Sequence, residues 1–259
     1  MIFVSLNRPL EMYKYLILIA FLFPLAAVAQ DNPFEYKEEK PPLTKNEFSF
    51  GLNVHTSGWG FDFRRGWNNT VKKKTVIEAE IVNMKHPKEV RSVNPYFDNA
   101  KSFFYGKMNT LTVFRAGYGK RIEIFEKAEQ GGVSVRLNYT VGPSFGFAKP
   151  VYLNILYPTA FEGEYQVVVE KYDPFEHYID NIYGRASFTK GIGEMKIYPG
   201  LFGKVGISFD YGRHYQDVKI IEAGVTFDAY GKEVPIMAFA DNSQFYLNFY
   251  INILYGRKW

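Results

Sequence analysis

Alternation of apolar and polar residues recurs along most of the chain and predicts β-strands with two unlike faces. The clearest run is Val133–Gly142, in which nearly every second residue is apolar. The last run, Phe245–Tyr255, keeps the same period close to the terminal Trp259. Six further runs show the pattern: Phe48–Val54, Trp59–Arg64, Thr75–Val82, Leu111–Gly119, Ile197–Tyr211 and Ile221–Asp228. The chain is therefore expected to be all-β, with about eight strands.

The connections between these runs alternate between short and long, and only residues 55–58 break the trend. The short ones are residues 63–75, 119–133 and 211–220, and the long ones are residues 83–109, 148–196 and 230–244. Outer-membrane barrels have short periplasmic turns and longer outer loops, and a tilted strand crosses a bilayer with about 9–11 residues. We therefore expect a transmembrane antiparallel up-and-down β-barrel in the outer membrane, with both termini in the periplasm.

The longest connection, Lys149–Lys196, is too long to be bare loop. Tyr165–Glu170 has the composition of a strand and could join the sheet, which would raise the strand number to ten. Residues Glu176–Thr189 place apolar side chains at helical spacing and predict a short helix. We expect this connection to cap the barrel mouth or to face a partner.

The first residues have the features of a secretory signal peptide. Lys14 precedes the apolar run Tyr15–Val28, and Ala27-Val28-Ala29 has the small-residue pattern of a cleavage site. The signal reads naturally from Met12, so the start codon at Met1 or Met12 stays open. The expected organisation is a signal peptide over residues 1–29, a Pro-, Glu- and Lys-rich periplasmic tether over residues 30–46, and the barrel over residues 47–259.

Composition narrows the classes of function. The chain contains 20 Tyr and 24 Phe, which are enriched in strands and in the aromatic girdles of membrane barrels. It has no Cys, so disulfides, thiolate metal sites and a lipoprotein anchor are excluded. The net charge of +4 is small and its charges are mixed, which argues against a nucleic-acid partner. No cofactor or metal site is expected, since His86 and His214 have no flanking ligands at metal spacing.

If the apolar faces contact lipid, the opposite faces line the lumen, and these carry charges of both signs. An eight-stranded barrel is only wide enough for its own side chains to fill, and a buried charge left unpaired is very costly. We therefore expect a structural ion-pair core centred on Arg115 and Arg136. The alternative is an ion path, and thus a narrow channel for small solutes. The expected core residues are Asp62, Arg64, Glu78, Glu80, Arg115, Arg136, Lys204, Asp210, Glu222 and Asp228.

A lipid-modifying enzyme at the outer rim is a second alternative. Such chemistry needs a nucleophile, a base within hydrogen-bond reach and a group that orients the base. His55 and Ser57 fall in the first outer connection, but no acidic residue completes the set. His177 has Asp173 close in sequence, with Ser187 as the nearest hydroxyl. Because these are common polar loop residues, we expect no catalytic residue and a non-enzymatic protein.

Two groups of residues suggest contact surfaces. Aromatic side chains in the second outer connection are too apolar for bare water, so they either fold over the barrel mouth or bind a partner protein. These are Tyr96, Phe97, Phe103, Phe104 and Tyr105. Basic residues gather around the first inner turn, where they form a solvated turn or contact lipid phosphates or an acidic partner. These are Arg64, Arg65, Lys72, Lys73 and Lys74.

The chain resembles a known group of proteins. The signal ending in Ala29-Gln30, the Tyr- and Phe-rich strands and the closing Gly256-Arg257-Lys258-Trp259 are similar to the small OmpX/OmpA-like outer-membrane barrels of Bacteroidota. The resemblance implies that the last strand is a signal read by the barrel-assembly machinery. It also implies a structural or interaction subunit of an outer-membrane protein complex, with outer-membrane lipid, that machinery and other outer-membrane proteins as partners. The residues of the assembly signal are Ile251, Ile253, Tyr255 and Trp259.

Overall fold

The computed structural model describes residues 46–70, 72–97, 99–127, 132–161, 164–214 and 216–259. The predicted signal peptide lies outside the described residues, and so does the predicted tether apart from Asn46, which begins the first strand.

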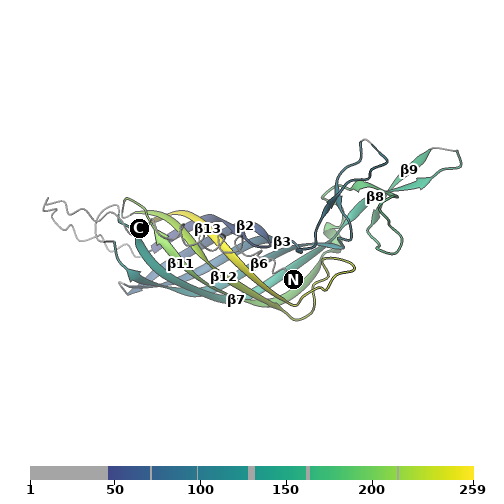
Figure 1. The fold of residues 1–259 in the computed structure, drawn as a ribbon. Coiled ribbons are helices and arrows are strands. Elements are labelled where there is room, and N and C mark those ends of the chain that lie inside the picture. Colours follow the sequence, from purple (N-terminus) through teal and green to yellow (C-terminus); the bar gives the residue numbers. More distant parts are fainter. Residues whose placement is uncertain (1–45, 71, 98, 128–131, 162–163, 215) are drawn as a thin grey trace, which may run out of the picture. The chain divides into compact units, whose positions relative to one another are not determined.

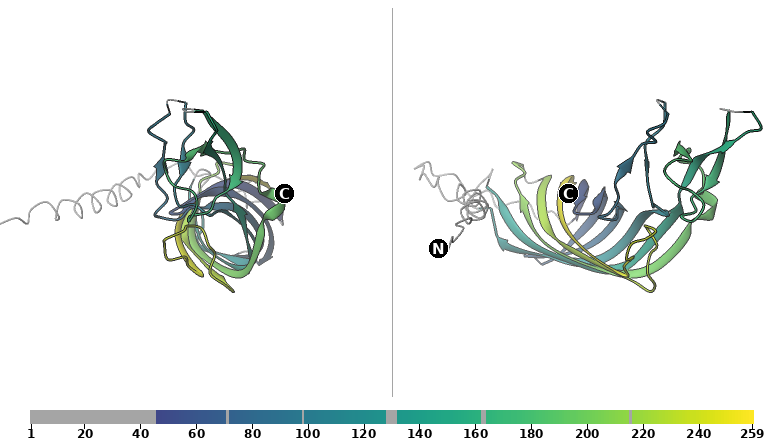
Figure 2. Two further views of the ribbon diagram at one scale, coloured as in Figure 1. Left: turned by 90° about the vertical axis from the view of Figure 1, so that its right-hand side faces the viewer. Right: turned by 45° about the vertical axis from the view of Figure 1, so that its right-hand side comes forward.

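Eight strands form a closed antiparallel barrel (Figures 1 and 2). Barrel strands that follow one another along the chain lie side by side in the barrel, and the first strand pairs with the last. The topology is therefore up-and-down. The prediction of eight strands is confirmed, and most strands extend beyond their predicted ends. Their bounds are β1 (Asn46–His55), β2 (Gly58–Thr70), β3 (Lys73–Met84), β6 (Asn109–Phe125), β7 (Ser134–Pro150), β11 (Lys196–Asp210), β12 (Asp217–Tyr230) and β13 (Phe245–Lys258).

The two ends of the barrel differ in their connections. Asn46 and Trp259 exchange backbone hydrogen bonds of 3.0 Å in each direction, so the first and last strands begin and finish at the same end. We call this the terminal end; it carries the short connections β2–β3, β6–β7 and β11–β12. The loop end carries the β1–β2 turn and the long connections β3–β6, β7–β11 and β12–β13. The predicted alternation of short and long connections is confirmed.

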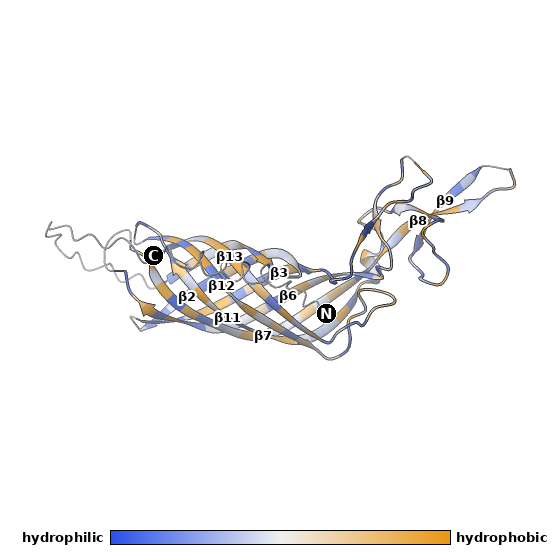
Figure 3. Ribbon diagram, in the orientation of Figure 1, coloured by the Kyte–Doolittle hydropathy of each residue, from blue (hydrophilic) through white to orange (hydrophobic). Residues whose placement is uncertain are grey.

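Apolar and polar residues alternate along the barrel strands (Figure 3), and the exposed fractions of the side chains place the apolar ones outside and the polar ones inside. Phe61 and Leu247 point outward and are each 61% exposed, whereas Glu222 points inward and is 0% exposed. A soluble barrel would bury its apolar face, so this arrangement suits lipid outside the barrel rather than water. The fold is an all-β transmembrane barrel, as the alternation predicts.

The long connections at the loop end contain further strands. β8 (Tyr152–Pro158), β9 (Tyr165–Lys171) and β10 (Ile182–Arg185) form a three-stranded sheet in the order β10-β8-β9. β4 (Arg91–Ser92) and β5 (Phe103–Phe104) form a small two-stranded sheet. The expected extra strand at Tyr165–Glu170 therefore exists, but it pairs with β8 rather than with a barrel strand. The ten-strand alternative is wrong.

The short helix predicted for residues 176–189 is also wrong. This segment contains β10 and turns, and the only helical element among the described residues is the 3-10 turn η1 (Ile192–Glu194). Ile182 is fully buried beside Leu153 in the three-stranded sheet. The Asn94 side chain donates hydrogen bonds to backbone carbonyls across this segment, 2.8 Å at Ile182. Long-range pairing thus satisfies backbone groups that a helix would have satisfied locally. No described helix is long and apolar enough to cross a membrane.

Candidate functional site: the barrel lumen and the loop-end connections

The middle of the lumen holds two cations surrounded by carboxylates. Arg64 donates two hydrogen bonds to Glu222, 2.6 Å from Nη1 to Oε2 and 2.9 Å from Nη2 to Oε1. Arg64 Nη2 also donates to Asp62 at 2.8 Å and to Glu78 at 3.1 Å. Lys204 Nζ donates to Glu78 at 2.5 Å. These side chains come from β2, β3, β11 and β12, so the pairs tie strands across the barrel.

A second cluster lies nearer the loop end. Arg115 donates from Nε to Asp228 Oδ1 at 2.8 Å and from Nη2 to Asp228 Oδ2 at 2.7 Å. Its third nitrogen, Nη1, donates to Glu80 at 2.9 Å. Ser144 donates to the same Asp228 carboxylate at 3.2 Å. Bidentate contact of this kind is the strongest geometry of an arginine and a carboxylate.

A third cluster surrounds Asp210 near the terminal end. Lys258 Nζ lies 2.6 Å from Asp210 Oδ2, and Arg136 Nη2 lies 3.1 Å from the same oxygen. Arg136 also contacts Glu123 at 3.3 Å. Lys127 Nζ reaches Asp210 Oδ1 at 3.4 Å. The cluster links β6, β7, β11 and β13.

The residues expected in the lumen are all buried and all take part in these clusters. The most connected cations are Arg64 and Lys204, whereas Arg115 and Arg136 were expected at the centre. Sequence reasoning missed Glu47, which pairs with Arg121 and with Lys74 at 2.6 Å. These residues alternate in step with the polar faces of β1, β6 and β3, so longer predicted strands would have included them.

Three carboxylates in the lumen are close enough to hold a metal ion. Asp62, Glu78 and Glu80 each offer an oxygen within 4.8 Å of the others. The Lys204 ammonium already contacts all three, at 3.3 Å for Asp62, 2.5 Å for Glu78 and also at Glu80. An ammonium group fills the position that a cation would take, so the cluster is an ion-pair centre.

The lumen leaves little free space. A small cavity of about 10 Å³ lies between Arg64, Glu78, Lys204, Glu222 and Tyr250. That volume is room for roughly one water molecule. An eight-stranded barrel is only just wide enough for its own side chains to fill, and the described charged side chains of this lumen occupy its middle as ion pairs.

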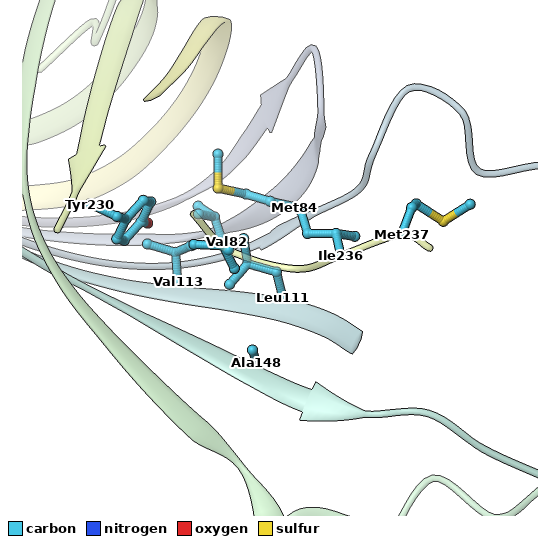
Figure 4. Packing of buried hydrophobic residues seen from close by; sticks show 9 residues of the cluster. Val82, Met84, Leu111, Val113, Ala148, Tyr230, Ile236 and Met237 are labelled. Atoms are coloured by element: carbon cyan, nitrogen blue, oxygen red, sulfur yellow. The ribbon is translucent and has the colours of Figure 1, made fainter. Parts of the chain in front are cut away.

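An apolar plug fills the lumen at its loop end (Figure 4). Val234 and Ile236, in the β12–β13 connection, are fully buried there. They belong to one packed cluster with inward-facing residues of the barrel wall. The wall residues are Val82 and Met84 of β3, Leu111 and Val113 of β6, Ala148 of β7 and Tyr230 of β12. The lumen therefore changes from charged to apolar toward its loop end.

Hydrogen bonds hold the plug in place. The Ile236 carbonyl accepts from the backbone N–H of Met108 at 2.9 Å and of Asn109 at 3.2 Å. The Asn109 side chain donates to the Pro235 carbonyl at 2.6 Å. The Asn242 side-chain oxygen accepts from Ile236 N–H at 2.8 Å. Because its backbone groups are paired, this segment can be buried without a large desolvation cost.

The histidines that could support catalysis are held in structural contacts. His177 is buried; its Nδ1 accepts from the Asp173 backbone N–H at 3.0 Å, and its Nε2 lies 3.2 Å from Glu170. With both ring nitrogens engaged, no nitrogen remains to activate a hydroxyl. Ser187 bonds to Thr189 at 3.0 Å instead.

The first histidine also lacks a nucleophile. His55 Nδ1 accepts from the Ser57 backbone N–H at 3.3 Å, while Ser57 Oγ donates to Asn248 at 2.6 Å. The serine hydroxyl is therefore directed at an amide oxygen rather than at the imidazole. Neither pair has the base-to-hydroxyl contact that covalent catalysis uses.

The aromatic residues of the β3–β6 connection divide into buried and exposed members. Phe103 is buried in a cluster with Leu153 and Ile182 of the three-stranded sheet. Tyr105 packs beside this cluster. Phe97 contacts Tyr165 and Tyr183 edge to face at 5.8 Å each, and Phe104 lies under Lys107 at 5.0 Å. Tyr96 remains exposed. Most of this group therefore packs within the chain, and binding of a partner by Tyr96 stays a prediction.

The basic residues of the first inner turn point in different directions. Arg64 points into the lumen, whereas Arg65 is exposed and lies over the Trp67 ring at 5.7 Å. Lys74 pairs with Glu47 inside the barrel, and Lys72 pairs with Glu126 at 3.3 Å. These basic residues therefore do not form one continuous surface patch. The residues of the expected assembly signal, Ile251, Ile253, Tyr255 and Trp259, are exposed at β13 and its end.

Comparisons with known proteins give likeness in structure alone. No protein-family model matches the chain, and no curated protein is a significant match. The solved structures include Ail, the attachment invasion locus protein of Yersinia pestis, at a TM-score of 0.41 and 9% identity over 83% of this chain and 99% of that one. A second structure of Ail, in complex with the heparin analogue sucrose octasulfate, gives the same values. Neisserial surface protein A has a TM-score of 0.40 and 9% identity over 83% and 96%.

Proposed function

We propose that this protein is a non-enzymatic outer-membrane β-barrel that acts as an interaction subunit of an outer-membrane protein complex. The barrel anchors the chain in the bilayer, and the loop-end connections provide the contact surface. The terminal end, with its short turns, faces the periplasm, in keeping with the usual arrangement of bacterial barrels.

The filled lumen favours this role over transport. Paired charges occupy its middle, and the plug formed by Val234 and Ile236 occupies its loop end. A solute would have to displace both layers to pass. The contacts of His55 and His177 likewise favour a binding role over acyl chemistry.

The observation that carries the proposal is a pair of exposed aromatic rings from two separate connections. Phe175, which follows β9, is 77% exposed, and Phe239, in the β12–β13 connection, is 71% exposed. Their rings meet edge to face at 6.2 Å. Phe239 has a φ of 56°, a backbone conformation that large side chains rarely adopt. Strain of this kind clusters at binding sites, and exposed aromatic rings are frequent anchors of protein interfaces.

The neighbouring sheet offers a second means of attachment. Among the described strands β9 pairs only with β8, so its other edge keeps free backbone groups. The edge is rich in Val and contains no Pro, features that leave it open to an added strand. An extended segment of a partner protein could therefore pair with β9 while Phe175 and Phe239 anchor it.

Affinity purification from detergent-solubilised membranes tests the proposal. The full-length protein is expected to bring down one or more outer-membrane proteins at fixed stoichiometry. The double variant Phe175→Ser, Phe239→Ser should fold and insert but lose them, whereas Lys232→Ser, an exposed polar change in the same connection as Phe239, should keep them. A wild-type protein that purifies alone, or variants that retain the same companions, would refute the proposal.

We infer that the barrel-assembly machinery is the first complex to examine, because the family resemblance includes its accessory barrels. The expected result is the central barrel of that machinery among the companions of the wild-type protein. If a different protein co-purifies at fixed stoichiometry, the interaction role is supported and the assignment to the barrel-assembly machinery is refuted.

A further inference from the structure

Charged side chains on the outer face of the barrel strands are distributed unevenly between the two ends. The alternation of buried and exposed residues along each strand shows which side chains face outward. In β2 the inward Arg64 is buried, while Phe61, Phe63 and Arg65 share the exposed outer face. The same reasoning places five exposed cations outward in the halves of their strands nearest the terminal end. They are Arg65 of β2, Lys73 of β3, Lys120 of β6, Lys219 of β12 and Arg257 of β13. We call this set the outer cation belt.

The loop end lacks an equivalent set among the described residues. Its outward strand cation is Lys149, which donates to the Phe188 carbonyl at 2.8 Å and lies over the Phe188 ring at 4.3 Å. Lys149 is therefore already engaged within the chain. Outward strand cations that are not engaged within the chain therefore gather at the terminal end of the barrel.

The cations of the lumen and those of the belt also differ in their partners. Each lumen cation forms ion pairs with buried carboxylates, as Arg64, Arg115 and Lys204 illustrate. Within the described part of the chain, none of the belt residues forms an ion pair. The outward acidic strand residue at this end is Asp217, which contacts His214 at 3.3 Å. Asp217 is also the register partner of Arg257, whereas the other four belt cations have no acidic register partner. The belt therefore keeps a net positive charge.

Aromatic residues lie beside the cations of the belt. Arg65 lies over Trp67 at 5.7 Å, and Lys120 and Lys219 are register partners of the outward Tyr139 and Tyr255. Trp and Tyr side chains prefer the headgroup region of a bilayer. Long basic side chains in that region extend their charged ends toward lipid phosphates.

We propose that the outer cation belt binds the phosphate groups of anionic phospholipids in the leaflet at the terminal end, and so concentrates these lipids around the barrel. The inference goes beyond the interaction role above, because it needs only membrane insertion and no protein partner. Each cation near an anionic surface is expected to raise the local lipid preference about fivefold, and salt should weaken it.

Trp67 gives a direct reporter of the lipid beside Arg65. In a Trp59→Phe, Trp259→Phe background, the remaining tryptophan fluorescence, excited selectively over that of tyrosine, comes from Trp67. The full-length protein is placed in phosphatidylcholine vesicles that contain either brominated phosphatidylglycerol or brominated phosphatidylcholine. We expect stronger quenching by the brominated phosphatidylglycerol, a preference that Arg65→Gln and Lys120→Gln each reduce about fivefold.

Matched controls separate the belt from surface charge in general. Lys149→Gln, at the loop end, and Lys72→Gln, in a turn where Lys72 pairs with Glu126, should leave the preference unchanged. Equal quenching by the two lipids would overturn the proposal, as would an equal loss in the control variants. Absence of a lipid preference, together with a co-purified acidic protein that Arg65→Gln releases, would assign the belt to a protein instead. Each outcome is independent of the Phe175 and Phe239 assay.

Discussion

Arg115 and Asp228 are joined across the lumen by two parallel hydrogen bonds, 2.8 Å from Nε to Oδ1 and 2.7 Å from Nη2 to Oδ2. The two residues are separated by 113 positions in the chain, on β6 and β12. Both side chains are buried, so water does not compete for these two hydrogen bonds. A pair of this kind fixes which strands face each other when the barrel closes.

Removal of one partner from this pair should be far more harmful than removal of both. Arg115→Met leaves Asp228 as a buried carboxylate without its cation, which is expected to cost about 3–5 kcal/mol of stability. Adding Asp228→Asn should restore most of that loss, since a neutral amide replaces the stranded charge. Urea unfolding from lipid vesicles, followed by tryptophan fluorescence, measures both changes.

The control for this experiment is Arg213→Met, which removes an exposed arginine of the β11–β12 connection. Its effect on the free energy of unfolding should be small. A double variant as unstable as Arg115→Met alone would contradict the ion-pair explanation.

The filled lumen predicts electrical silence. In a planar bilayer the folded wild-type protein should show no sustained conductance, because the plug and the paired charges each block the path. Ile236→Asp introduces a carboxylate into the plug and should loosen it, yet this variant should also be silent, because the charged layer remains. The heat-dependent shift in gel mobility confirms that both proteins are folded. Steady ion-conducting openings in the wild-type protein would disprove the sealed lumen.

The strands could be predicted because lipid and lumen impose opposite requirements on neighbouring residues. Phe61 must face lipid and Asp62 must face the charged interior, so the period of two is strict along each wall. Strand ends were less visible, since the alternation weakens where the barrel leaves the membrane. In β6 the register also shifts between Glu123 and Phe125. The early end assigned to this strand explains why Arg121 was missed.

The plug and the loop-end sheet depend on contacts that local sequence does not encode. Residues 234–237 are a short apolar run without periodicity, so nothing in the run itself places it inside the barrel. The barrel strands nevertheless carried a sign of the plug. Val82 and Leu111 are apolar residues on inward faces that otherwise carry charged residues. The absence of a helix at Ile182 likewise follows from the distant Asn94 side chain.

Loss of the loop-end histidines should leave membrane lipids unchanged. His55→Ala and His177→Ala remove the two rings that a lipid-modifying enzyme would use. Because His177 is engaged by Asp173 and Glu170, we expect it to stabilise its own loop rather than to react. Mass spectrometry of outer-membrane lipids from cells that express each variant is the measurement. A changed acyl pattern in either variant, in membranes with a normal amount of the barrel, would restore the enzymatic alternative.

Alkaline pH should weaken the loop-end sheet through Tyr172. Burial, reinforced by the nearby Tyr105, raises the pKa of the Tyr172 hydroxyl above its usual value of 10.0. A group whose pKa is raised on folding favours the folded state at low pH. Its contribution is therefore complete below the pKa of the unfolded chain, near 10, and is lost as the pH rises through the higher pKa of the folded state.

The measurement is the difference in phenolate absorbance between the wild-type protein and Tyr172→Phe during a titration to high pH. The extra tyrosine of the wild type should ionise above the ordinary tyrosine range, because its ring is packed against Tyr105 and His177. The tertiary signal of the loop-end sheet should be lost over the same interval in the wild type and later in Tyr172→Phe. A difference titration centred at or below the usual tyrosine pKa would show that Tyr172 is not buried in solution, and that the cluster around Phe103 is open.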